Sequence, residues 1–98
     1  MTRIDRIQQN ERRLDAIEAA ASALAEALDS YEAAQEAVRE LEAYYTSDEW
    51  TSDLDADRAG ELPSDLKRGV LSEDAAYDAL TENRELAVRM LDIVSKML

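Results

Sequence analysis

The sequence predicts an all-α fold, and three features support that prediction. The 98 residues include 17 Ala, together with many Glu, Leu and Arg, all of which favour helices. The two Gly and the single Pro lie between positions 60 and 69, which is too little turn chemistry for an all-β protein. Large apolar residues recur every seven positions, as along a helical seam. We expect a long N-terminal helix packed with a shorter C-terminal helix and a partly helical linker, forming a helical bundle completed by dimerisation.

The first helix is expected over residues 3–46. Thr2 can cap its first turn, with Asp5 three residues later in the position of a capping box. Asn10 and Gln35 interrupt the apolar rows, where they either fix the register of a partner helix or are solvated residues near the ends. The two rows that predict this helix are Ile7, Leu14, Ala21 and Leu28, and Ile17, Leu24, Tyr31, Val38 and Tyr45.

The linker covers residues 47–71, which is too long for a structureless connection inside a compact domain. Ser47 or Ser52 can cap a short helix that carries Trp50 and ends at Gly60. The spacing of Trp50 with the apolar residues around it favours a packed plug over a platform for a ligand.

A further turn is expected over residues 62–66, with Gly69 as its end. The second long helix is then expected over residues 73–97, with Ser72 as the capping residue. Its seam consists of Tyr77, Leu80, Ala87, Leu91, Val94 and Leu98. Because 98 residues are near the size at which a single core is only marginally stable, a second independent domain is not expected, and we expect one helical domain over residues 1–98.

Composition excludes most enzyme classes. The chain has no Cys and no His, so it lacks thiol nucleophiles, imidazole bases and the usual zinc ligands. Catalysis by carboxylates alone would require a concave pocket that a narrow Ala-rich helical domain rarely offers. We therefore expect a protein that is not an enzyme and has no cofactor.

The charge of the chain limits its partners. Its net charge of −12 argues against nucleic acid as a partner, because phosphate recognition needs Lys and Arg. The longest uncharged run has seven residues, far below the roughly 20 apolar residues that cross a membrane. The start of the chain also lacks the apolar stretch of a secretory signal. We expect a cytoplasmic protein that binds neither nucleic acid nor membranes.

Asp53, Asp55 and Asp57 are weak candidates for metal ligands. Their alternation resembles the start of a calcium loop, but that loop needs Gly at its sixth position and Glu at its twelfth. Arg58 and Ser64 occupy those positions here. The alternative, that the three aspartates belong to a solvated acidic segment, is favoured, and no metal site is expected.

The interface is predicted from a difference in helix length. The C-terminal helix covers only about half of the first one, which leaves part of the apolar stripe without a partner in the chain. We expect the exposed residues to join two chains in a homodimer, although a linker folded back along the first helix could also cover them. The predicted interface residues are Ile4, Ile7, Leu14, Ile17 and Leu24.

The distribution of charge suggests an orientation for the dimer. Residues 1–13 carry a net charge of +2 and residues 14–45 a net charge of −7. An antiparallel pair would bring opposite ends together, whereas the alternative is that the gradient serves solvation only. The function expected is that of an oligomeric structural or protein–protein interaction module. The alternative is an acidic inhibitor or nucleic-acid mimic that binds a basic partner through residues 46–74.

The sequence also resembles a known family over roughly residues 4–94. The resemblance is strongest from Tyr44 to Leu80, in the segments Tyr44-Tyr45, Ser47-Asp48-Glu49-Trp50 and Gly69-Val70-Leu71-Ser72-Glu73-Asp74-Ala75. These segments are similar to the bacterial domain of unknown function 4298 family. The resemblance implies a small, soluble, helical bacterial protein, and it supplies no catalytic residues.

Overall fold

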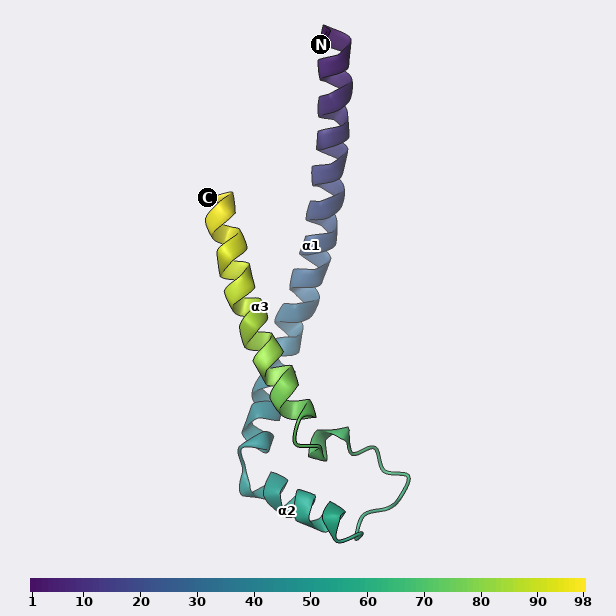
Figure 1. Ribbon diagram of the computed structural model, residues 1–98, viewed down its shortest axis with the longest axis vertical. Helices are drawn as coiled ribbons and strands as arrows, with labels where there is room; N and C mark the ends of the chain where they lie inside the picture. The colour runs from purple at the N-terminus through teal and green to yellow at the C-terminus, as the bar shows by residue number, and fades with distance from the viewer. The chain divides into compact units, whose positions relative to one another are not determined.

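A computed structural model describes all residues 1–98, and its regular secondary structure is entirely helical. These are α1 (Arg3–Tyr45), α2 (Asp48–Arg58), the 3₁₀ turn η1 (Gly69–Leu71) and α3 (Ala75–Met97) (Figure 1). The prediction of an all-α fold with a partly helical linker is confirmed. The chain divides into two compact units, unit 1 (Met1–Gln35) and unit 2 (Glu36–Leu98), with the boundary inside α1.

Unit 1 is the N-terminal part of α1, and it begins with the predicted capping box. The Thr2 backbone N–H donates to the Asp5 carboxylate at 3.1 Å, and the Asp5 N–H donates to the Thr2 hydroxyl at 3.1 Å. These two bonds satisfy backbone donors that the first helical turn leaves free. The backbone bond from Thr2 is the main reason why the pKa of Asp5 is lowered.

Helix α2 is capped by Ser47, one of the two candidate residues, and ends at the predicted Gly60. The Ser47 hydroxyl accepts a hydrogen bond from the Trp50 N–H at 3.4 Å and caps the first turn. At the other end, the Glu61 N–H donates to the carbonyl of Ala56 and the Gly60 N–H to that of Asp57, each at 3.0 Å. This is a Schellman motif, which needs the left-handed backbone that Gly60 adopts with a φ of 72°.

The segment before α3 differs in two places from the sequence prediction. Gly69 begins η1 and does not end a preceding turn. Helix α3 begins at Ala75, two residues later than expected. The reason is that the Ser72 hydroxyl accepts a hydrogen bond from the Ala75 N–H at 3.1 Å. The turn that this bond closes, residues 72–75, therefore precedes the regular helix. The expected turn at residues 62–66 is present, with a hydrogen bond from the Leu66 N–H to the Pro63 carbonyl at 3.2 Å.

The small core of unit 2 joins α2, η1 and α3. Leu54, Leu71 and Ala76 are the buried apolar residues of the chain, and each comes from a different one of these elements. Two ion pairs hold the connection between α2 and α3 in place. Arg58 pairs with Glu73 at 2.6 Å, and Arg68 pairs with Asp57 at 2.9 Å.

Trp50 is packed as a plug, as its spacing predicted. Its indole N–H donates to the Val70 carbonyl at 3.0 Å, which links α2 to η1. Its ring lies edge-on to the ring of Tyr45, with 4.9 Å between the centroids. Aromatic pairs favour this geometry, so Trp50 holds both α1 and η1 against α2.

Candidate interaction surfaces

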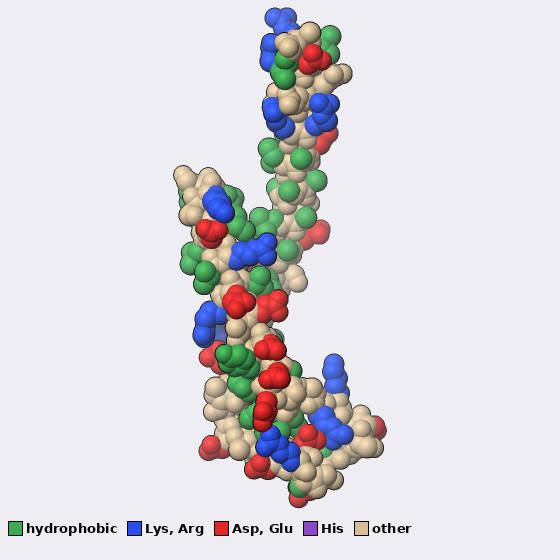
Figure 2. All heavy atoms as spheres, in the orientation of Figure 1, with side chains coloured by type: hydrophobic (Ala, Val, Ile, Leu, Met, Phe, Trp, Pro, Cys, Tyr) green, Lys and Arg blue, Asp and Glu red, His purple; other side chains and the backbone are tan.

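The most extended apolar surface of unit 1 is the α1 stripe, defined as Ile4, Ile7, Leu14, Ile17, Leu24 and Leu28. Each of these six side chains has between 44% and 66% of its surface exposed. No residue of α1 is buried, and unit 1, which consists of one helix, offers its part of α1 no second element to pack against. All five residues predicted for the interface belong to this stripe. Figure 2 shows hydrophobic side chains following one another along this part of α1.

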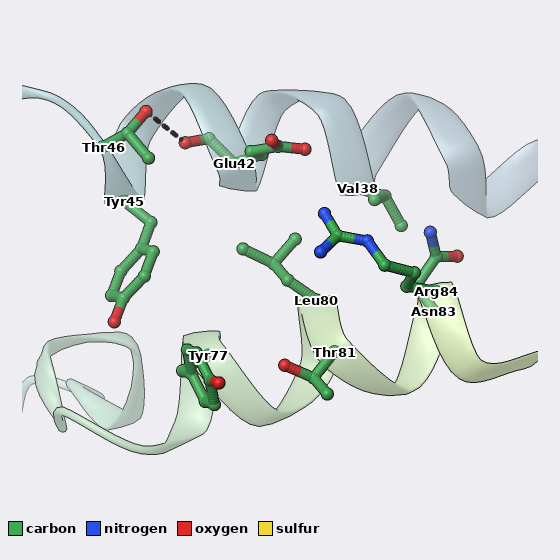
Figure 3. Close-up of a pocket in the computed structure, with 9 residues that line it drawn as sticks. All are labelled: Val38, Glu42, Tyr45, Thr46, Tyr77, Leu80, Thr81, Asn83 and Arg84. Carbon is green, nitrogen blue, oxygen red and sulfur yellow. Dashed lines mark hydrogen bonds between the residues drawn. The ribbon is translucent and has the colours of Figure 1, made fainter.

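The same rows of residues are covered where they continue into unit 2. Val38 and Tyr45 belong to the row that contains Ile17 and Leu24, and both are half-buried. They face α3, which supplies Leu80 on the opposite side (Figure 3). The α1 seam is therefore a helix-packing surface in unit 2, and in unit 1 the same kind of surface is open.

A groove of about 210 Å³ lies between α1 and α3 inside unit 2. Its walls are formed by Val38 and Glu42 of α1 and by Leu80 and Arg84 of α3, and Figure 3 shows the Leu80 and Arg84 side chains directed toward α1. Pockets for small ligands usually have volumes of about 300–1,000 Å³. The groove is smaller than that range, which fits a packing seam between two helices better than a ligand site. Sequence reasoning did not identify it, because no local pattern shows which turns of two distant helices meet.

The C-terminal half of α3 is a second apolar surface. Val88, Leu91, Val94 and Met97 are 45–71% exposed. Within unit 2, α1 contributes residues 36–45, about 15 Å of helix, which is too short to face all of the roughly 35 Å of α3. The sequence prediction treated Leu91 and Val94 as part of a packed seam, but in the structure their side chains are exposed.

The arginines at the start of α1 form no ion pair within the chain. The three ion pairs of the structure lie in unit 2, and none involves a residue of α1. Arg13 donates to the neutral Asn10 side-chain oxygen at 3.2 Å, and the Asn10 amide donates to the Arg6 carbonyl at 2.8 Å. Figure 2 shows Lys and Arg side chains gathered at the N-terminal end of the chain. These cations are available to a partner.

The three candidate metal ligands have different surroundings. Asp53 accepts a hydrogen bond from the Tyr44 hydroxyl at 2.5 Å, Asp57 pairs with Arg68, and Asp55 is exposed on α2. The structure contains no cluster of three or more acidic side chains that could hold a metal ion. Asp53 and Asp57 therefore link neighbouring elements, and Asp55 faces solvent.

The bond between Tyr44 and Asp53 joins the end of α1 to α2. Hydrogen bonding to the Asp53 carboxylate raises the pKa of Tyr44 to about 12, with smaller effects from burial and from nearby negative charge. The neutral phenol is thus stabilised in the folded chain, and the Tyr44 side chain fixes the turn between the two helices. The sequence reasoning missed this pair, because its members lie nine residues apart on different helices.

Comparison with known proteins identifies the family. The model of a family described as "Domain of unknown function (DUF4298)" matches residues 7–93 of the 98-residue chain. The chain belongs to this family. The resemblance seen in the sequence is thereby confirmed, and the family match spans both units.

In two further comparisons, no curated protein and no solved structure matched this chain. The helices were also compared with the requirements for crossing a lipid bilayer. None of them combines the necessary length with a sufficiently apolar, uncharged segment.

Proposed function

We propose that this protein is a helical protein–protein interaction module that forms a homodimer through the α1 stripe. The observation that carries the proposal is the open seam of unit 1, whose six large apolar side chains are 44–66% exposed. A single helix in water is only marginally stable, and most helices in proteins depend on packing of an apolar face. A second copy of the chain brings the same stripe and can cover it.

The free energy gained by burying the α1 stripe is of the same size as the cost of association. Burying a whole Leu or Ile side chain contributes about 1.5–3 kcal/mol, so burying the exposed half contributes about 1 kcal/mol. Six residues on each of two chains then give roughly 12 kcal/mol. The cost of bringing two molecules together is about 4–15 kcal/mol. Because gain and cost are similar in size, we expect a dimer that dissociates on dilution.

This role requires no catalytic group and no cofactor. The α1 stripe, the helix caps and the packed turn around Trp50 all serve to build and hold helices. In this proposal the protein acts in the cytoplasm as a small acidic module whose surface charge keeps it soluble while the stripe selects its partner.

Amide hydrogen exchange at different protein concentrations tests the proposal. We expect slow exchange over residues 7–28 at high concentration and much faster exchange after dilution, because the isolated seam frays when the partner leaves. Residues 48–58 of α2 serve as an internal control, since their packing lies within unit 2. Exchange over residues 7–28 that does not change with concentration would contradict the proposal.

A further inference from the structure

We propose that the second copy docks on the α1 stripe in parallel orientation and in register. Ion pairs then form from Arg6 to Glu11 and from Arg13 to Glu18 of the second copy, twice in each dimer. This inference rests on the proposed function and adds the orientation, the register and the residues that select them.

The two arginines and two glutamates lie at the positions beside the seam that face each other in a parallel pair. In heptad notation, positions a and d form the seam, and positions g and e lie beside it. With Ile7 at position a, position g holds Arg6 and Arg13, and position e holds Glu11 and Glu18. In a parallel pair of helices, each g residue faces the e residue five positions later on the other chain. Both arginines therefore face a glutamate.

These four side chains have no competing ion pairs in the chain. All ion pairs of the structure lie in unit 2. The hydrogen bond that Arg13 makes is to a neutral amide, so its charge is not compensated there. Charged side chains beside an apolar seam usually determine which partner binds and in which direction. Here, the unpaired charges of one copy complement those of another.

An antiparallel pair lacks this complementarity. In such a pair, each e residue faces an e residue of the second copy, and each g residue faces a g residue of the second copy. If Leu14 is aligned with Leu24 of the second copy, the two Glu18 carboxylates face each other, and Arg6 and Arg13 face alanines. The charge gradient along α1 favours the antiparallel orientation, but Arg12 and Glu26, which that alignment brings level with each other, both occupy position f on the outer faces of the two helices. Salt screens charges beyond about 8–10 Å, so the closer pairs at positions g and e decide the orientation.

Asn10 supports the same register. It occupies a d position inside the seam, where a parallel pair places it opposite Asn10 of the second copy. The antiparallel alignment described above places it opposite Leu28, so its side chain keeps only the hydrogen bonds within its own chain, to the Arg6 carbonyl and from Arg13. Opposite a second Asn10, it also gains a polar partner across the seam. The parallel register is the one in which the two amides meet.

Distances between spin labels on the full chain test the orientation. The chain contains no Cys, so the variants Gln8→Cys, Asp15→Cys and Ser22→Cys each carry one label at equivalent heptad positions on the exposed side. In a parallel pair in register, the three variants give the same short distance. In any antiparallel pair, a shift of seven residues changes the axial separation by about 21 Å, because each residue adds 1.5 Å on both chains. The three distances then cannot be equal.

The possible outcomes separate the two proposals. Equal short distances support both the dimer and its parallel register. Unequal distances in a species with the mass of a dimer leave the proposed function standing and overturn the parallel register. A monomeric mass with no coupling between labels overturns both.

Charge reversal tests the residues that select the register. The double variant Arg6→Glu, Arg13→Glu is expected to weaken the parallel dimer about tenfold, since exposed pairs each contribute little. Adding Glu11→Arg and Glu18→Arg restores opposite charges and is expected to restore the affinity. Circular dichroism of each variant shows whether α1 stays helical. Equal affinity of the double variant and the original chain, or no recovery in the fourfold variant, would overturn the assignment.

Discussion

The apolar character of the α1 stripe can be removed by substitution without disturbing the packing inside either unit. Leu14 and Ile17 lie at its centre and are 47% and 65% exposed. We therefore consider the double variant Leu14→Gln, Ile17→Gln. Gln favours helices about as well as Leu and better than Ile, so α1 keeps its intrinsic helix propensity.

The expected effect follows from the exposed area. Each of the two side chains contributes about 1 kcal/mol to the dimer by burial, and the dimer contains each of them twice. The loss is therefore about 4 kcal/mol, which raises the dissociation constant about a thousandfold, since 1.4 kcal/mol corresponds to a factor of ten. The thermal stability of unit 2 should be unchanged, because neither residue belongs to that unit.

Sedimentation equilibrium over a range of protein concentrations measures this effect. The matched control is Ala19→Gln, Ala33→Gln, which places the same side chain away from the seam and should preserve the dimer. If the Leu14 and Ile17 variant dissociates no more readily than this control, the stripe is not the interface and the reasoning is refuted.

Three further predictions concern unit 2. Tyr44→Phe should lower stability by about 1 kcal/mol near neutral pH, because it removes a hydrogen bond to Asp53. Since folding raises the pKa of Tyr44 to about 12, that bond stabilises the chain below the ordinary tyrosine pKa of 10 and is lost between about pH 10 and 12, so the difference in melting temperature between variant and original should vanish there. Trp50→Phe should cost about 1–2 kcal/mol, measured by urea unfolding with circular dichroism, because the bond to the Val70 carbonyl is lost. Gly60→Ala should cost about 1–2 kcal/mol through the positive φ alone, since no atom lies within 4 Å of the added methyl group.

Each of these predictions has a clear contradicting result. A constant difference between Tyr44→Phe and the original chain from pH 8 to 12 would show that the phenol is not held neutral by the carboxylate. Unchanged urea midpoints would show that Trp50 and Gly60 do not stabilise the fold as the structure indicates.

Local patterns predicted much of the fold. The seven-residue rows gave α1 within one residue of its end, and Ser47 and Gly60 marked the two ends of α2. These features depend on neighbouring residues along one helix, so the sequence contains them directly. The reciprocal hydrogen bonds of Thr2 and Asp5 likewise join residues close together in the sequence.

Features that depend on distant residues were not predictable in this way. The start of α3 was placed two residues early, because the sequence does not show that Glu73 pairs with Arg58 or that Ser72 caps a turn outside the helix. The groove beside Leu80 and the bond between Tyr44 and Asp53 both require knowing how separate helices meet.

The molecular mass of the unmodified protein in solution decides whether two chains associate through α1. Sedimentation equilibrium or light scattering at several concentrations should show a reversible change from twice the 11.0 kDa chain mass toward the chain mass on dilution. A mass of one chain at every concentration, including the millimolar range, would contradict the account.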